Sequence, residues 1–280
     1  MPTMLRSGLC TQAQLESPSF RAWCQRLGLP HGLHRKLWEH AFICQALQER
    51  DLLRPGCRGL GFGVGREPLA ALFASEGCEI VATDLAPEAA DRLGWIEGQQ
   101  HAACLEALNA AGLCPADRFA RLASFRFVDM NAIPKDLTGF DLCWSACSFE
   151  HVGSISLGLR FVDRMLDCLR PGGWAVHTTE FNVSSNEATL DNGPTVLFRR
   201  RDLVGLADRL SRLGHKIELD LDPGSGWADG FIDAPPYSHN PHLKLRLAEY
   251  VTTSVGLIIE KGPDRLSLRL RRAFGLRKGA

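Results

Sequence analysis

Glycines stand at alternate positions in one short stretch of the chain: Gly59, Gly61, Gly63 and Gly65. Residues without a Cβ let the backbone turn sharply and approach a bound ligand closely. The stretch lies between an expected strand at 57–61 and an expected helix at about 67–75, whose free N–H groups would face the same place. A second expected strand at 79–83 ends in Asp84, an acid that can hold a ribose diol by charge-assisted hydrogen bonds. These residue types and spacings predict a site for a nucleoside-containing cofactor.

Further candidate residues follow the next two expected strands. Asp129 stands just beyond a strand at 125–128, where it could accept a hydrogen bond from an adenine amino group, and Met130 could cover the ring. A strand at 140–146 would end at the same edge of a parallel sheet. The residues expected to bind the cofactor are Gly59, Gly61, Phe62, Gly63, Gly65, Glu67, Asp84, Leu85, Asp129, Met130, Asn131, Ser145 and Ala146.

The elements that must position these residues alternate between strands and helices. Strands are expected at 57–61, 79–83, 125–128, 140–146, 174–180, 216–220 and 252–259. Helices are expected at 17–27, 33–53, 67–75, 87–94, 96–111, 155–169 and 201–213. The first 16 residues carry little pattern and are expected to lack regular structure. Such alternation is typical of an α/β protein with a doubly wound, mostly parallel sheet.

The order of these motifs resembles the class I S-adenosylmethionine-dependent methyltransferase family. The matching residues are the glycine loop at 58–65, Asp84 as the ribose acid, Asp129 as the adenine acid and the Leu-Arg-Pro-Gly-Gly turn at 169–173. The resemblance implies a Rossmann-like, seven-stranded sheet whose last strand is antiparallel. It also implies S-adenosyl-L-methionine as cofactor and S-adenosyl-L-homocysteine as product.

The glycine loop departs from that family at its start. Family members often carry an acid there, where this chain has Arg58 or Leu60. Glu67 or Glu39 is expected to hold the methionine ammonium group instead. An NAD site is the alternative interpretation of the glycines, although GxGxGxG differs from GxGxxG and a dehydrogenase does not explain the later Pro-Gly-Gly turn.

Five segments describe the expected organisation of the chain. Residues 1–53 would form an N-terminal helical extension or lid, and 54–262 the S-adenosylmethionine-binding domain. Two polar loop insertions, 181–200 and 222–242, are long enough to be binding loops and are expected to cover the site. The segment 263–280 is a basic tail that could touch an anionic membrane surface or nucleic acid, or could simply be solvated.

Two residues are expected to take part in methyl transfer. An in-line displacement needs an aligned acceptor and, for a hydroxyl or ammonium acceptor, a group that removes a proton. His151 follows the strand at 140–146 and could be that base, or could only close the pocket or cap the next helix. Glu180 stands at the unusually polar end of the fifth strand and is expected to orient the acceptor. Substrate contacts are expected from Trp38, Glu150, Asn182, Tyr237 and His239.

Plain alternatives exist for three of these substrate contacts. Trp38 could equally pack in the core. Tyr237 and His239 stand in a proline-rich segment, 235–242, that could be an ordinary rigid turn.

Composition narrows the class of protein. Lysine plus arginine and aspartate plus glutamate number 32 each, so the formal net charge is zero, which disfavours a nucleic-acid partner. The ten cysteines show no paired framework, which favours a reducing, cytoplasmic compartment. No zinc-like cysteine cluster and no acid–histidine set demands a metal, so transfer is expected to be metal-independent. No apolar run approaches membrane-spanning length.

The sequence therefore predicts a methyltransferase (EC 2.1.1.-) that methylates an oxygen, or a nitrogen, of a small polar metabolite or of a sugar or glycan component. The alternatives are an RNA or protein methyltransferase, an NAD-dependent oxidoreductase and a non-catalytic cofactor-binding protein. The sequence specifies no oligomeric state.

Overall fold

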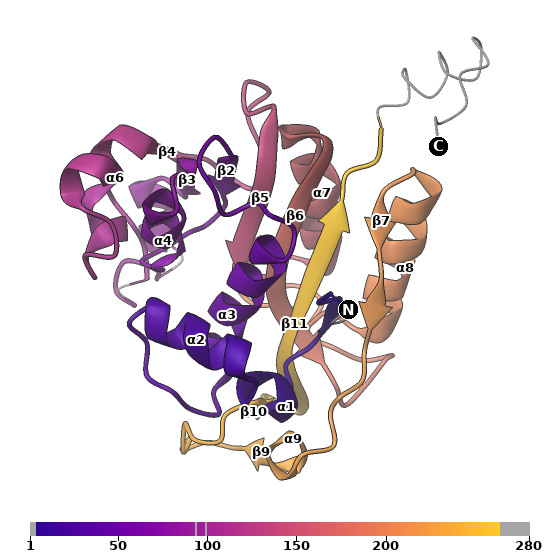
Figure 1. The fold of residues 1–280 in the computed structure, drawn as a ribbon. Helices are drawn as coiled ribbons and strands as arrows, with labels where there is room; N and C mark the ends of the chain where they lie inside the picture. Colours follow the sequence, from indigo (N-terminus) through magenta and orange to yellow (C-terminus); the bar gives the residue numbers. More distant parts are fainter. Residues whose placement is uncertain (1–3, 93, 99, 264–280) are drawn as a thin grey trace, which may run out of the picture.

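The computed structural model describes residues 4–92, 94–98 and 100–263 (Figure 1). Its strands are β1 (Ser7–Leu9), β2 (Arg58–Gly61), β3 (Glu79–Asp84), β4 (Ala123–Phe127), β5 (Phe140–Ala146), β6 (Leu169–Asn182), β7 (Lys216–Ile217), β8 (Leu219–Asp220), β9 (Ile232–Asp233), β10 (Lys244–Leu247) and β11 (Tyr250–Glu260). Its α-helices are α1 (Gln12–Leu15), α2 (Pro18–Arg26), α3 (Arg35–Gln48), α4 (Leu69–Ser75), α5 (Pro87–Arg92), α6 (Ala116–Leu122), α7 (Ile155–Met165), α8 (Arg200–Arg212) and α9 (Trp227–Gly230). Short 3-10 turns occupy Glu106–Asn109, Phe149–His151 and Leu166–Cys168.

The described strands form one sheet with the order β4-β3-β2-β5-β6-β11-β1-β8, and β7, β9 and β10 pair beside this path. The five strands from β4 to β6 are parallel. Chain order reverses at β2, which pairs with β3 on one side and β5 on the other. In open α/β sheets the crevice at such a reversal, beyond the carboxyl ends of the strands, is where ligands bind.

Strand β11 runs against its neighbours. It is antiparallel to β6, with Thr252 opposite Asn182 and Glu260 opposite Trp174, and it is also antiparallel to β1, β7 and β10. Side chains alternate along β11: Ser254 and Gly256 lie against Glu39 and Phe42 of α3, whereas Val255 and Leu257 belong to the core on the opposite face.

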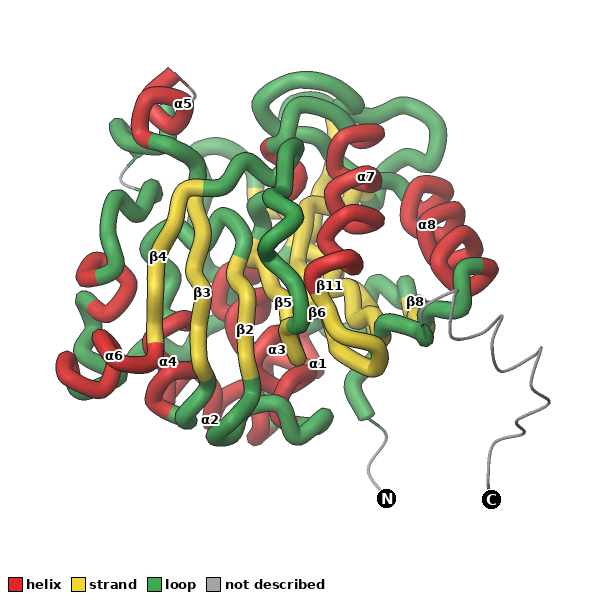
Figure 2. Tube along the Cα trace, turned by 90° about the horizontal axis from the view of Figure 1, so that it is seen from above, coloured by secondary structure: helices red, strands yellow, loops and turns green. Residues whose placement is uncertain are grey.

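Helices cover both faces of the sheet, and each face has its own apolar core (Figure 2). Trp144 and Ile258 belong to the core under α2, α3 and α4, whereas their chain neighbours Cys143 and Ile259 belong to the core under α7 and α8. This alternation within runs that are apolar throughout is what a strand buried on both faces requires.

Several sequence predictions are corrected by the structure. The sheet has eleven strands among the described residues, not seven. The expected helix at 96–111 is absent: 94–98 form turns and only Glu106–Asn109 is helical, as a 3-10 turn. One reason is that the backbone N–H of Ala102 donates to Asp84 at 3.1 Å, a tertiary contact that a local helix would not allow. Helix α6, which follows, was not predicted.

The N-terminal segment is also different from what was expected. The first 53 residues contain α1, α2 and α3, but β1 pairs with β11 and β8 in the main sheet. This segment is thus built into the domain and is not a helical extension added to it. Apart from Pro263, the basic tail predicted at 263–280 lies outside the described residues. Within the described residues, no helix has the length and apolarity that crossing a membrane would take.

Gly256 provides a test of how α3 packs on the sheet. A Cβ at this position of β11 would lie 2.2 Å from the ring of Phe42 on α3, so Gly256→Ala must push the helix away from the strand. We expect a loss of about 1–3 kcal/mol in the free energy of unfolding, measured by urea denaturation. Gly205→Ala is the matched control, because nothing lies within 4 Å of a Cβ there. This exposed position in α8 should gain up to ~1 kcal/mol. Equal stability of the two variants would contradict the packing described here.

Candidate active site

A cavity of about 880 Å³ opens at the carboxyl ends of β2, β3, β4 and β5. The residues predicted from the sequence to bind a cofactor that do line it are Gly63, Gly65, Glu67, Asp84, Leu85, Asp129, Met130, Asn131 and Ala146. His151, predicted as a base, lines it as well. The structure therefore brings together residues from four strand ends that lie far apart in the sequence.

The glycine loop divides into two halves with different tasks. Gly63 and Gly65 adopt positive φ angles of 54° and 51° and line the cavity. Gly59 and Gly61 do not line it. They make room for the indole of Trp144, which a Cβ on Gly61 would approach to 2.4 Å. Phe62 also points away from the cavity, because its ring is buried against Phe161.

Asp84 ends β3 beneath the glycine loop. Its Oδ2 accepts hydrogen bonds from the backbone N–H groups of Gly65 and Ala102, both at 3.1 Å, and its Oδ1 accepts one from Leu85 at 2.8 Å. Burial raises the pKa of Asp84, although these donors act against the rise. Oδ1 has a second lone pair, which leaves this carboxylate able to accept one more hydrogen bond from a ligand.

Glu67 is the second carboxyl group in this part of the cavity. Its Oε1 accepts a hydrogen bond from the indole N–H of Trp144 at 2.6 Å. Burial raises the pKa of Glu67 to about 8, and the nearby Asp84 adds to the rise. The side chain is therefore mostly protonated at neutral pH, and a cation bound beside it would favour release of that proton.

The ends of β4 and β5 supply the opposite wall. Asp129 is exposed to the cavity, and its Oδ1 accepts a hydrogen bond from the backbone N–H of Asn131 at 2.8 Å. Ala146 lines the cavity, whereas Ser145 is buried with its hydroxyl 2.7 Å from Nδ1 of His177. Ser145 is thus part of the core, and its expected contact with a cofactor is not supported by its position.

His151 lies at the rim where the loop 181–200 reaches the cavity. Its Nδ1 lies 2.7 Å from the carbonyl oxygen of Pro194, which is the geometry of an Nδ1–H donor and leaves the Nε2 lone pair free. Nε2 lies 3.9 Å from Oε1 of Glu150. That oxygen is buried and has no hydrogen-bond partner among the described residues, while Oε2 accepts from Thr179 at 3.0 Å. Burial raises the pKa of Glu150, and the neighbouring His151 opposes the rise.

Glu180 does not reach the cavity, so its predicted role in orienting an acceptor is not supported. Its carboxylate is ion-paired with Arg35 at the start of α3, and it accepts a hydrogen bond from Thr252 at 2.8 Å. Arg35 also pairs with Glu39 at 3.3 Å. Burial would raise the pKa of Glu39, but Lys36 and Arg35 hold it at about 2. Glu180 belongs to a buried charge network that fastens α3 to the sheet.

None of the five predicted substrate contacts lines the cavity: Glu150 is fully buried, and the other four lie elsewhere. Trp38 is fully buried against Phe42 and donates to Gln14 at 2.7 Å, which is the core-packing alternative. Asn182 holds the turn that follows β6, accepting from Ser184 and Ser185 at 3.0 Å each. Tyr237 and His239 pack against each other in the segment 222–242. None of that segment lines the cavity, although it was expected to cover the site.

Some cavity residues were missed by the sequence analysis. Lys36 and His40 lie on α3, Trp95 lies between the two expected helices 87–94 and 96–111, and Gln100 and His101 lie within the second of these ranges. His101 Nε2 lies 2.7 Å from the carbonyl oxygen of Leu85, and the ring of Trp95 packs edge-on against His151 at 4.5 Å. No motif marks these residues, because tertiary contacts place them.

No protein-family model matches the sequence, and no curated protein does. Solved structures with a similar fold exist. A putative sarcosine dimethylglycine methyltransferase from Galdieria sulphuraria is 15% identical, with a TM-score of 0.47 over 88% of this chain and 99% of that one. A SAM-dependent methyltransferase from Methanosarcina mazei is 14% identical, with a TM-score of 0.46 over 78% and 98%. A glycopeptide N-methyltransferase is 13% identical, with a TM-score of 0.46 over 79% and 94%.

These solved structures are described as methyltransferases, and the chain resembles them in fold. At these identities and TM-scores the likeness concerns the fold alone.

The raised pKa of Glu67 predicts a pH dependence of stability. The pKa of Glu67 is about 8 in the folded chain and 4.5 in the unfolded chain. Between these two pH values the folded state therefore binds more protons than the unfolded state. Stability should therefore fall as pH rises from about 4.5 to about 8, by up to about 5 kcal/mol.

Urea denaturation at several pH values measures this contribution. Glu67→Gln keeps the acceptor for Trp144 and should flatten the fall, being more stable than the parent at pH 8. Glu79→Gln, at an exposed position on β3, should leave the profile unchanged. A parent-like fall in Glu67→Gln would show that another group causes it.

Proposed function

We propose that the chain is an S-adenosylmethionine-dependent methyltransferase that acts on an oxygen or nitrogen of a small polar acceptor. The observation that carries the proposal is the pair of carboxyl groups, Glu67 and Asp84, beside the glycine loop. Both line the cavity, and burial raises the pKa of each.

The charge of this pair favours one kind of nucleoside cofactor over another. S-adenosylmethionine carries an ammonium and a sulfonium group, and each positive charge would be stabilised beside a carboxylate. NAD carries a pyrophosphate and no ammonium or sulfonium group, so it would gain nothing from Glu67, whereas Asp84 could hold the ribose of either cofactor. The reversed strand β11 also differs from the fully parallel order of a dinucleotide-binding sheet.

The residues present fit S-adenosylmethionine in a second respect. A Cβ at Gly63 would meet the Cβ of Ser148 at 2.8 Å, and one at Gly65 would meet the carbonyl oxygen of Gln100 at 2.6 Å. Glycine at these two positions thus lets the loop pack against Ser148 and Gln100 where it borders the cavity. In the proposal Glu67 holds the ammonium group, Asp84 the ribose and Asp129 the adenine amino group. When bound, the cofactor supplies a methyl group activated by its positive sulfur.

The acceptor side of the cavity lies near His151. Its free Nε2 can take a proton from an acceptor hydroxyl or ammonium group, and the unpaired oxygen of Glu150 would stabilise the resulting imidazolium. His151 and Glu150 therefore act as a proton-accepting pair, with Pro194 fixing the ring. The loop that carries Pro194 encloses this end, which favours a small acceptor over a polymer.

Arg66 favours a second candidate function. It lines the same cavity and could contact a phosphate, as an NAD-dependent oxidoreductase would require. Direct binding measurements separate the two candidates.

Isothermal titration of the full chain with S-adenosylmethionine, S-adenosylhomocysteine and NAD tests the cofactor. We expect the first two to bind and NAD not to bind. Because Glu67 is mostly protonated at pH 7, binding of the ammonium group should release on the order of one proton, seen by comparing buffers of different ionisation enthalpy. Glu67→Gln should abolish that release. Asp129→Asn should weaken binding about tenfold, worth ~1.4 kcal/mol.

Asp117→Asn is the control for Asp129, because it changes an exposed acid on α6 outside the cavity. Tight NAD binding without S-adenosylmethionine binding would reject the proposal.

His151→Asn tests the proton acceptor. Turnover should fall about 100-fold or more while the affinity for S-adenosylmethionine stays within about twofold, because the ring acts on the acceptor. The measurement is transfer of a labelled methyl group in a screen of hydroxyl- and amine-bearing metabolites. His31→Asn, an exposed histidine outside the cavity lining, should match the parent. Unchanged turnover in His151→Asn would show that His151 is not the proton acceptor and that its role is structural.

A further inference from the structure

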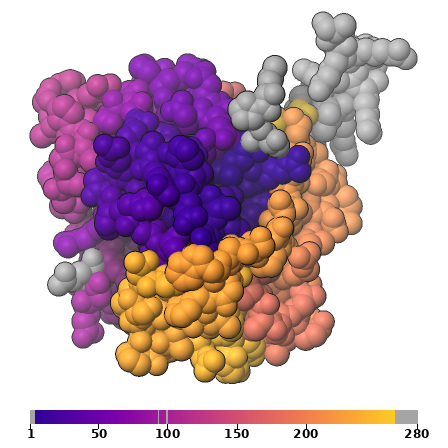
Figure 3. Space-filling model, turned by 60° about the horizontal axis from the view of Figure 1, so that its bottom comes forward, coloured from indigo at the N-terminus to yellow at the C-terminus, as the bar shows by residue number. Residues whose placement is uncertain are grey.

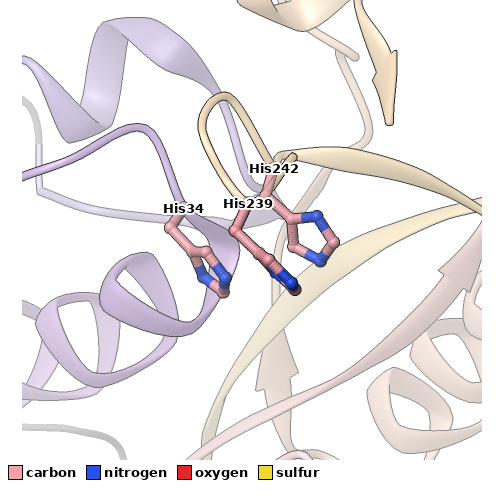
Figure 4. A group of neighbouring side chains, drawn as sticks. All are labelled: His34, His239 and His242. Carbon is pink, nitrogen blue, oxygen red and sulfur yellow. The ribbon is translucent and has the colours of Figure 1, made fainter. Parts of the chain in front are cut away.

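Three histidine side chains, none of which lines the cavity, meet beside the start of α3 (Figure 4). They are His34, just before α3, and His239 and His242, in the segment that leads to β10. Each offers a ring nitrogen, and the three nitrogens lie within 4.8 Å of one another. We propose that His34, His239 and His242 bind one divalent transition-metal ion, with Zn²⁺ as the first choice, and that the ion clamps this segment onto the start of α3.

The backbone holds two of the three ligands together before any ion binds. His34 and His242 form an isolated parallel bridge, in which Arg35 N–H donates to His242 O at 3.1 Å and His242 N–H donates to Leu33 O at 2.7 Å. The two rings stack with their centroids 4.7 Å apart. The space-filling view shows the surface of this C-terminal segment in orange, directly against the indigo N-terminal helices (Figure 3).

Asp233 supports His242 in the way that metal-binding histidines are commonly supported. His242 Nδ1 lies 2.6 Å from Oδ2 of Asp233, so Nδ1 carries the proton and the Nε2 lone pair is free for an ion. Burial would raise the pKa of Asp233, but hydrogen bonds from Ser238 and His242 outweigh it and hold that pKa below its usual range. The same carboxylate accepts from the backbone N–H of His239 at 3.1 Å, which ties the second ligand to the first.

The cation next to His34 in the chain is already paired. The charge of Arg35 is offset by its ion pairs with Glu180 and Glu39.

Binding has one identifiable cost. In the structure, His34 Nδ1 accepts a hydrogen bond from Lys36 N–H at 3.1 Å and so caps α3. An ion on Nδ1 would use the same lone pair, and an ion on Nε2 would move the ring proton to Nδ1. In both cases the helix cap is lost. The free energy lost with the cap is small compared with the free energy of zinc binding to imidazole ligands.

The ligand set and geometry select the ion. Imidazole suits Zn²⁺, Ni²⁺ and Cu²⁺, and three histidines leave a fourth position for water. A tetrahedral Zn–N distance of about 2.0–2.1 Å puts ligand nitrogens about 3.3 Å apart, so the rings must close by roughly an ångström. His239 is exposed and can make that adjustment.

A second group of potential ligands, Cys147, Glu150 and Glu180, is a weaker candidate. Arg35 already neutralises Glu180, and burial raises the pKa of the Cys147 thiol well above its usual value. The histidine cluster has no such competing cation bound to its ring nitrogens.

The test uses the full chain without a histidine tag, freed of metal by a chelator and titrated calorimetrically with zinc chloride. We expect one ion per chain with a dissociation constant on the order of 1 µM or tighter, and a rise of several degrees in the thermal midpoint. Cobalt in place of zinc should give the visible absorption of a four-coordinate ion.

His239→Asn is the informative variant. His239 has a φ of 62°, which asparagine tolerates, so the loop should keep its shape while an imidazole is lost. We expect zinc binding to weaken at least 30-fold and the thermal shift to vanish, while His31→Asn behaves as the parent. No binding by the parent, or equal affinity in His239→Asn, would overturn the proposal. Neither result depends on the methyltransferase assignment, because no cofactor is present.

Discussion

The buried guanidinium group of Arg35 is the interaction on which the arrangement around the cavity depends. It pairs with Glu180 on β6 and Glu39 on α3, and it donates to the hydroxyl of Ser254 on β11 at 3.1 Å. A buried charge is tolerated only when it is paired, so this contact fixes where α3 begins relative to two strands. Two turns further along α3, the close contact between Phe42 and Gly256 fixes the distance between the helix and β11. Together, these two contacts hold α3 in place against β6 and β11.

The charges at the cavity can be understood from that network. Arg35 and Lys36 are balanced by Glu39 and Glu180, so they offer little to neutralise the acids beside the glycine loop. Glu67 instead keeps a raised pKa and a proton. A cationic ligand bound beside this protonated acid would lower its pKa, so that the acid loses its proton and pairs with the ligand. In the proposed function, this acid is what would receive the ammonium group of the cofactor.

The sequence predicts the parts of the site that depend on strand geometry. The strand 140–146 was placed to the residue, because an apolar run bounded by glycine is a strong local signal. Asp84 and Asp129 were placed at the cavity because parallel strands end at one edge. Glu180 also ends such a strand, but its partner Arg35 is distant in the sequence, and no local pattern reveals that pairing. The helix predicted at 96–111 is wrong for the same reason, because the contact of Ala102 with Asp84 is also not visible in a local pattern.

The two polar loops show how similar composition can lead to different placement. Both were expected over the cavity. In the first loop, 181–200, Asn182 accepts a hydrogen bond within the turn that follows β6. The loop then runs back to the cavity, where the carbonyl oxygen of Pro194 contacts His151. The second loop, 222–242, instead lies against the start of α3, where the backbone of His242 pairs with that of His34. Since His34 directly precedes Arg35 and Lys36, an ion bound there would act on the turn of α3 that reaches both the charge network and the cavity. The histidine cluster can thus stabilise the cavity wall without contacting any ligand within it.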